Sequence, residues 1–111
     1  RICPSCKEET VPSEKSLELA GIPDVPGKIY WHGVGCDQCF RSGYRGRIGV
    51  FEVMMVQEEL RRCILDGADR KRFMEAAREA SGYVTMAEHA RKLVDKGITT
   101  VDEVIRTLMT L

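Results

Sequence analysis

Two CxxC segments decide how this chain folds, CPSC at residues 3–6 and CDQC at residues 36–39. Each segment places two thiols on one tight turn, and residues 7–35 separate the two turns. Two such turns brought together supply four sulfur ligands in a tetrahedral arrangement, as a closed structural zinc site requires. Because cysteine fills all four positions, none is left for water or substrate. The sequence therefore predicts a structural zinc ion bound by Cys3, Cys6, Cys36 and Cys39.

Other roles for the cysteines remain open but are less favoured. A disulfide framework would leave one of the five cysteines unpaired, and CxxC pairs of this kind fit a reducing cytosol better. His32 lies just upstream of Cys36 and could replace one cysteine as a ligand. A rubredoxin-like iron electron carrier has similar cysteine spacing, but Lys7 and Phe40 follow the second cysteines, where small glycines normally keep the backbone near the sulfurs. Cys63 lies on an apolar helical face and is predicted to be a core residue.

Charge and hydropathy limit the classes of partner. The 111 residues carry 17 Lys and Arg against 17 Asp and Glu, so the formal net charge is zero, and the charges are well mixed. Nucleic-acid binding usually needs a basic stripe, so a zinc-ribbon nucleic-acid module is the weaker alternative and we expect no nucleic-acid partner. No apolar run is long enough to span a bilayer, so we expect no direct membrane insertion. The chain opens on Arg1 rather than methionine, and we expect it to be a piece of a longer cytoplasmic protein.

The sequence predicts an α+β fold in two parts. Residues 1–43 hold both CxxC segments and all four prolines, with a short helix expected at residues 13–20 and a strand at 28–32. This part is poor in aliphatic residues, so we expect the metal to hold it together. Residues 44–111 begin with an extended strand over 44–53. Three or four helices are expected after this strand, at residues 57–66, 69–82, 85–97 and from 100 onward.

The sequence carries no recognisable catalytic motif of its own. A P-loop requires Gly-x-x-x-x-Gly-Lys followed by Ser or Thr, so that backbone amides and the lysine surround the phosphates. Here Gly27-Lys28 is followed by Ile29, and Ile22 stands where the first glycine belongs. No Ser-His-Asp or His-Glu-x-x-His arrangement is present either. We therefore expect no catalytic residue and no nucleotide hydrolysis by this chain alone.

Three arginines, Arg41, Arg45 and Arg47, cluster after the second CxxC segment. Arginine can grip a carboxylate or phosphate in a forked geometry, and the two glycines between these positions let a backbone approach closely. One interpretation is a solvated loop with internal ion pairs. The other is a docking edge for another domain or subunit. Both interpretations remain open from the sequence.

Several motifs together carry a family resemblance. They are RICPxC at residues 1–6, GCxxCxxxGYRGRIGVFEVM at 35–54, SGYVTM at 81–86 and KGITTVDEV at 96–104. In this combination the chain resembles the C-terminal part of the type II secretion and type IV pilus assembly ATPases, the GspE/PilB family. The resemblance covers essentially the whole chain. Its one departure is Tyr83, where the family more often carries methionine, and this concerns packing alone.

The resemblance implies more than cysteine spacing does. Such ATPases are cytoplasmic hexamers docked at the inner membrane, where ATP hydrolysis moves a platform protein that extrudes a pilus or pseudopilus. Their P-loop core, which uses ATP and magnesium, lies upstream of the first cysteine. The four cysteines match the family's metal ligands, residues 45–54 match a strand of the ATPase domain, and the helices that follow match its helical subdomain. The implied partners are the rest of the ATPase, its neighbouring subunits and the platform protein.

Overall fold

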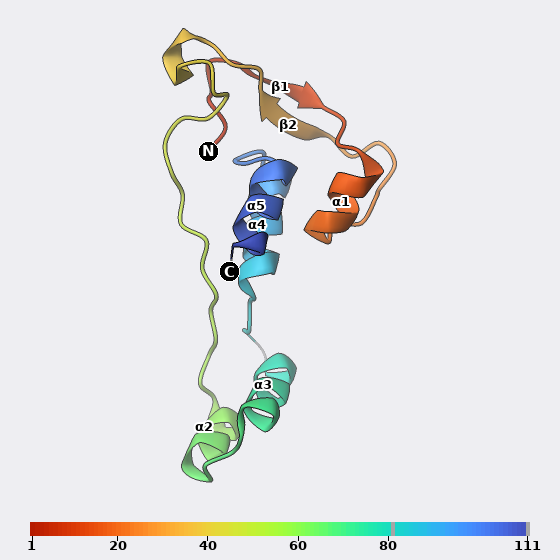
Figure 1. Ribbon diagram of the computed structural model, residues 1–111. Helices are drawn as coiled ribbons and strands as arrows, with labels where there is room; N and C mark the ends of the chain where they lie inside the picture. Colours follow the sequence, from red (N-terminus) through yellow and green to blue (C-terminus); the bar gives the residue numbers. More distant parts are fainter. Residues whose placement is uncertain (81, 111) are drawn as a thin grey trace. The chain divides into compact units, whose positions relative to one another are not determined.

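The computed structural model confirms the α+β class, with two antiparallel strands and five α-helices among the described residues (Figure 1). The structure describes residues 1–80 and 82–110, so Ser81, which belongs to the family-like SGYVTM run, and Leu111 lie outside it. The chain forms two compact units, Arg1–Val50 with Ala87–Leu111, and Phe51–Met86. Within the described ranges, no helix has the length and apolarity needed to cross a membrane.

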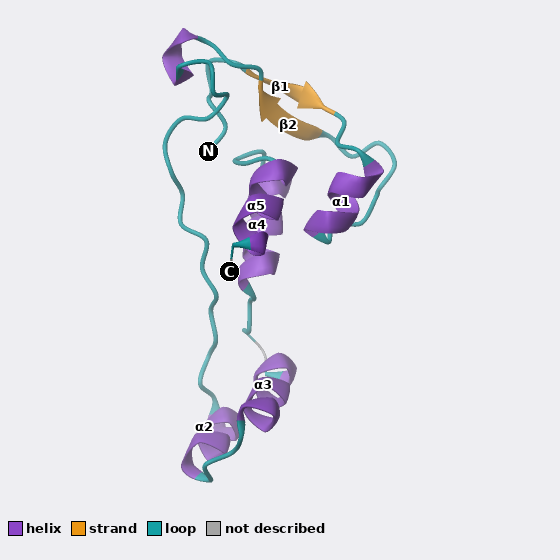
Figure 2. Ribbon diagram, viewed as in Figure 1, coloured by secondary structure: helices purple, strands orange, loops and turns teal. Residues whose placement is uncertain are grey.

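A two-stranded antiparallel sheet carries the two CxxC turns in the first unit; residues 11–29, which include a helix, connect its strands, and we call this pair of strands the hairpin. Strand β1 (Lys7–Thr10) directly follows the first turn, and strand β2 (Tyr30–Gly33) precedes the second (Figure 2). The strands pair antiparallel with Lys7 opposite Gly33, so the two turns emerge at the same end of the hairpin. The sequence does not predict β1, because its KEET residues are polar and lack a strand-like alternation. Pairing with β2 supplies the stability that this local sequence lacks.

The helices of the first unit enclose its hydrophobic core. Helix α1 (Glu14–Ala20) begins and ends as predicted, because the Ser13 hydroxyl accepts from the Ser16 N–H and Gly21 adopts the left-handed conformation. Helix α1 packs against α5 (Val101–Met109), and α4 (Met86–Asp95) contributes to the same cluster. Each fully buried aliphatic side chain contributes about 1.5–3 kcal/mol. The buried residues of this core are Leu17, Ala20, Ile22, Tyr30, Ala90, Val94, Val101 and Val104.

The strand expected over residues 44–53 is reduced to two isolated bridges. Tyr44 pairs with Ile2 in the first unit, and Val53 pairs with Val84 in the second. The residues between them are drawn as loop in Figure 2. A strand exists only where a neighbouring strand accepts its backbone hydrogen bonds, and among the described residues such neighbours are present at the two ends alone.

The second unit is built on two helices, α2 (Glu58–Leu65) and α3 (Arg70–Glu79), which pack against each other. Helix α3 begins where the sequence predicted, and the Asp69 carboxylate caps it by accepting from the Arg72 N–H at 2.8 Å. Cys63 on α2 is only 5% exposed, which confirms its assignment to a core. The Glu52 carboxylate accepts from the Met86 N–H at 3.1 Å and connects the two ends of this unit.

Two glycines allow a close backbone approach beside the hairpin. A Cβ atom added at Gly43 would overlap the Gly33 carbonyl oxygen, and Gly43 has a φ of +82°. The Gly43 carbonyl also accepts from the Cys3 N–H at 3.0 Å. This approach therefore sets the path of the chain between the two CxxC turns.

We predict that Gly43→Ala lowers the free energy of unfolding by about 2–4 kcal/mol, through about 1 kcal/mol of left-handed strain and the rest from overpacking. Gly27→Ala is the matched control, since Gly27 has a φ of +80° but nothing within 4 Å of an added Cβ atom. The control is expected to lose only about 1 kcal/mol. Urea unfolding of both variants measures the difference, and equal losses would contradict the steric explanation.

Candidate metal centre

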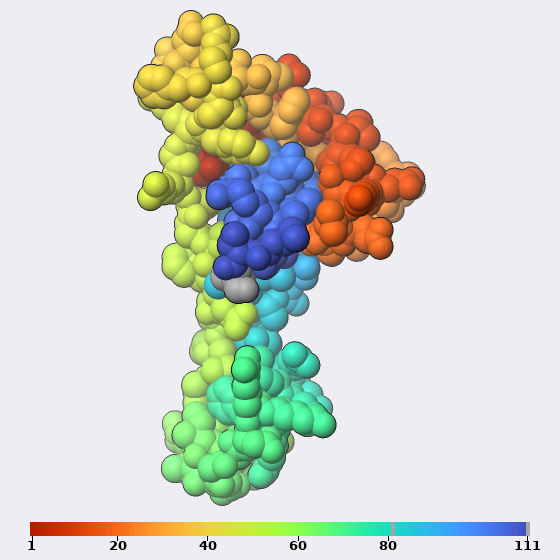
Figure 3. Space-filling model, in the orientation of Figure 1, coloured from red at the N-terminus to blue at the C-terminus, as the bar shows by residue number. Residues whose placement is uncertain are grey.

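The four predicted ligands lie in two similar turns. Cys3 and Cys6 bound the turn before β1, in which the Cys6 N–H donates to the Cys3 carbonyl at 3.4 Å. Cys36 and Cys39 bound the second turn, a short 3-10 helix η1 (Asp37–Cys39), in which the Cys39 N–H donates to the Cys36 carbonyl at 3.3 Å. Cys3 and Cys39 are buried, and the other two cysteines are half-buried. The second turn lies at one end of the first unit, yellow in the space-filling view (Figure 3).

The sulfur positions match the geometry of a four-coordinate metal site. All four Sγ atoms lie within 4.8 Å of one another. The Cys3–Cys36 and Cys6–Cys39 sulfur pairs are each 3.8 Å apart, and the Cys36–Cys39 pair is 3.7 Å apart. A tetrahedral ion with metal–sulfur bonds of about 2.3 Å requires sulfur–sulfur edges of about 3.8 Å. The cysteines are free thiols rather than disulfides, and their cluster could hold one metal ion.

Backbone N–H groups point at two of the sulfurs. The Gly35 N–H donates to the Cys6 sulfur at 3.3 Å. The Cys36 and Gly43 N–H groups each donate to the Cys39 sulfur at 3.2 Å. Such donors favour negative charge on the sulfur and orient it, as groups around metal ligands commonly do.

The same contacts give the Cys6 and Cys39 thiols very different acidities. Burial raises the pKa of Cys6 to about 12, although the Gly35 N–H opposes this. Burial also acts to raise the pKa of Cys39, but hydrogen bonds from the Cys36 and Gly43 N–H groups and from the Cys36 and Cys6 thiols together lower it to about 6. At neutral pH, Cys39 is therefore largely a thiolate, whereas a metal ion must displace a proton from Cys6.

The alternative ligands lie elsewhere. His32 Nε2 is 3.4 Å from Glu8 Oε1, on the exposed face of the hairpin. Among residues 1–80 and 82–110, the four paired cysteines form the one group placed to share a metal ion. Cys63 lies in the second unit and is not part of the cluster. The structure therefore brings together the four cysteines of the CxxC segments, and neither Cys63 nor His32 belongs to their cluster.

The three clustered arginines have different surroundings. Arg41 forms an exposed ion pair with Asp37 at 2.8 Å, which contributes little stability. Its φ of +65° follows a φ of +52° at Phe40, so the chain reverses direction directly after Cys39. The Arg45 backbone N–H donates to the Arg1 carbonyl at 2.9 Å, while the side chains of Arg45 and Arg47 are exposed. Arg41 therefore forms an internal ion pair, as the solvated-loop interpretation predicts.

Three hydrogen bonds connect the cysteine turns to the turn between α4 and α5. They run from the Ile2 N–H to the Ile98 carbonyl at 2.8 Å, from Lys7 Nζ to the Gly97 carbonyl at 2.6 Å, and between the hydroxyls of Tyr44 and Thr100 at 2.7 Å. The Lys7 ammonium also lies 5.1 Å from the centre of the Trp31 ring, a favourable cation–π distance. Sequence patterns gave no signal for these contacts, because each joins residues that are far apart in the chain.

We predict that metal affinity falls as the pH is lowered. Between about pH 8 and pH 7 the loss is at least about tenfold, since binding displaces the Cys6 proton, and below about pH 6 the slope steepens as Cys39 also takes up a proton. Competition with a chromogenic chelator across this range measures the slope. A Cys63→Ser variant should show the same slope, and an affinity independent of pH would contradict the prediction.

The family model for "Type II/IV secretion system protein" matches residues 1–106 of this chain. Among similar proteins, the type IV pilus assembly ATPase PilB of Thermus thermophilus is 33% identical, over 95% of this chain and 12% of that protein. The type II secretion system protein E of Pseudomonas aeruginosa is 30% identical, over 95% of this chain and 20% of that protein. PilB of Myxococcus xanthus is 35% identical, over 95% of this chain and 19% of that protein.

The family-model match runs through both CxxC turns and reaches into α5. The chain spans a fifth or less of the length of each of these three relatives. From the match over residues 1–106, this chain belongs to the type II/IV secretion system protein family.

Proposed function

We propose that the four cysteines bind one structural zinc ion, and the sulfur–sulfur distances of 3.7–3.8 Å are the observation that carries this proposal. Zinc favours four thiolates at these distances and keeps no open position when all four are present. The ion supplies no chemistry beyond neutralising and fixing the sulfurs. The chain's own residues hold the turns in place through the N–H groups of Gly35, Cys36 and Gly43.

The role of this zinc ion is to fix the α4–α5 turn relative to the hairpin. A two-stranded sheet is only marginally stable alone, so the turns at its end need a further constraint. The hydrogen bonds of Ile2, Lys7 and Tyr44 then extend this constraint to residues 97–100. On this basis residues 1–43 act as the zinc-binding subdomain, and residues 44–111 supply the other helices, of which α4 and α5 pack into the same compact unit as residues 1–50.

The whole protein is, in this proposal, a hexameric ATPase of type II secretion or type IV pilus assembly. The support is the family membership, together with relatives that are named as pilus assembly ATPases and secretion system proteins. ATP and magnesium bind in the larger protein, outside this chain, whose sequence contains no P-loop. The zinc-stabilised region serves subunit contact or the transfer of motion to a platform protein at the cytoplasmic face of the inner membrane. Arg41, Arg45 and Arg47 form the proposed contact edge.

We predict that Cys36→Ser in the full-length protein removes zinc and impairs oligomer assembly and secretion or piliation. Loss of one ligand should weaken zinc binding by more than about 100-fold, because loss of groups around a ligand alone costs 10–100-fold. Nucleotide binding should persist, since its site lies in another part of the protein. Elemental analysis, size-exclusion chromatography with light scattering, and a nucleotide-binding titration measure these three properties.

Cys63→Ser is the matched control, because Cys63 lies outside the sulfur cluster. This substitution is expected to leave zinc content and assembly unchanged. Normal assembly and secretion by a zinc-free Cys36→Ser protein would refute the structural role. Iron with visible absorbance in the unmodified protein would instead support a rubredoxin-like electron carrier.

A further inference from the structure

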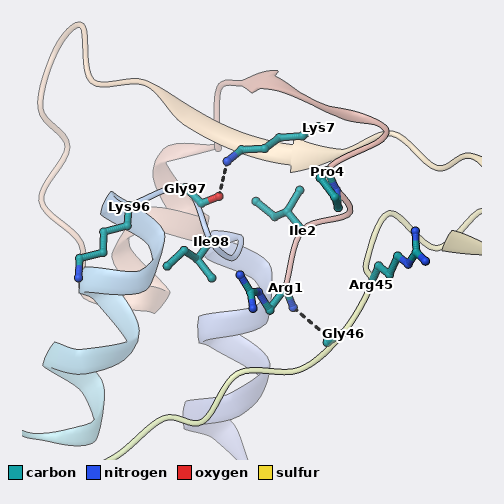
Figure 4. A pocket seen from close by; sticks show the side chains of 9 residues that line it. All are labelled: Arg1, Ile2, Pro4, Lys7, Arg45, Gly46, Lys96, Gly97 and Ile98. Carbon is teal, nitrogen blue, oxygen red and sulfur yellow. Dashed lines mark hydrogen bonds between the residues drawn. The ribbon is translucent and has the colours of Figure 1, made fainter. Parts of the chain in front are cut away.

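A surface cavity of about 420 Å³ lies beside the first CxxC turn in the first unit (Figure 4). Its walls come from three separate stretches of chain, the first CxxC turn, the loop at residues 45–46 and the α4–α5 turn at residues 96–98. The Ile2 N–H donates to the Ile98 carbonyl at 2.8 Å, and this bond fixes two of the walls together. The cavity is therefore part of the folded framework rather than a gap between mobile loops.

The centre of the cavity is apolar. Ile2, Pro4 and Ile98 contribute to its lining, and Figure 4 shows the Ile2 and Ile98 side chains facing each other across it. Ile2 is only 6% exposed, so it forms the floor rather than the rim. A volume near the lower end of the usual range for ligand pockets, about 300–1,000 Å³, suits one large side chain better than a nucleotide.

The rim of the cavity is cationic. Among the described residues that line it, four are basic, Arg1, Lys7, Arg45 and Lys96, and none is acidic. The Lys7 ammonium already donates to the Gly97 carbonyl, so it holds the wall. Arg45 and Lys96 extend outward from the rim in Figure 4, where their charged ends can reach a partner.

We propose that this cavity binds a protein partner through one large apolar side chain flanked by carboxylates. The apolar side chain contacts Ile2 and Ile98, and the neighbouring carboxylates pair with Arg45 and Lys96. An apolar anchor within a charged rim is the usual division of roles in a protein interface. A phosphate ligand would use the cations but leave the apolar floor without a partner.

This inference deepens the proposed function, because it states the chemistry of a partner of the secretion or pilus ATPase. Its test measures binding at the cavity and not zinc content. A failed binding experiment would contradict the cavity proposal but leave the zinc proposal standing. A folded chain without zinc would contradict the zinc proposal but not the cavity proposal.

The test uses the zinc-loaded, ¹⁵N-labelled chain and follows its amide signals by nuclear magnetic resonance. The probe is a blocked tripeptide with one Phe between two Asp residues. The matched probes replace both Asp residues by Asn, or the Phe by Ala, and inorganic phosphate is the fourth. We expect the Asp-Phe-Asp peptide to shift the Ile2, Gly97 and Ile98 amides in a saturable manner, with each matched probe at least about fivefold weaker.

The variant Arg45→Glu/Lys96→Glu should weaken binding of the Asp-Phe-Asp peptide at least about fivefold. Lys15→Glu/Lys92→Glu is its control, with the same change in net charge at exposed residues outside the cavity. Unchanged binding in the control supports the proposal, provided that circular dichroism and zinc content are unchanged in both variants. Equal weakening in both variants, equal affinity for phosphate or the Ala peptide, or no shift with any probe would overturn the proposal.

Discussion

The first unit depends on one constraint, the convergence of four cysteine sulfurs from two turns. The hairpin that carries these turns has only two short strands, and such a ribbon is marginally stable by itself. The hydrophobic core lies on α1, β2, α4 and α5 and includes neither CxxC turn. The four sulfurs lie within 4.8 Å of one another, three of their pairs are 3.7–3.8 Å apart, and two of the sulfurs receive N–H donors, so the cluster could hold one metal ion. A closed site of this kind supplies folding free energy directly.

The constraint reaches the helices through short connections. Ile2 lies next to the first ligand and bonds to Ile98, while Lys7 follows the second ligand and bonds to Gly97. Tyr44 follows the close contact between Gly43 and Gly33 and bonds to Thr100. Each connection therefore begins within a few residues of a ligand or of the glycine contact, and ends in residues 97–100.

Local signals in the sequence predicted much of this structure. Features that depend on residues far apart in the chain could not be predicted in this way. The sequence predicted helix starts near residues 13, 69 and 100, and there the side chains of Ser13, Asp69 and Thr100 each accept a hydrogen bond from a nearby backbone N–H. The sulfur cluster followed from the spacing of the CxxC pairs. Strand β1 and the reduced strand over 44–53 depend on which partners lie beside them, and no local pattern records that. The contact of Lys7 with Gly97 was invisible for the same reason.

Hydrogen exchange at the Ile2 amide, with and without a chelator, tests the central claim most directly. This amide bonds to the Ile98 carbonyl, so it reports whether the metal site holds the α4–α5 turn. The account predicts that chelation accelerates exchange at Ile2 and at Ile98, while amides within α3 in the second unit keep their protection. Unchanged exchange at Ile2 and Ile98 after complete metal removal would show that the cysteine cluster does not hold this turn.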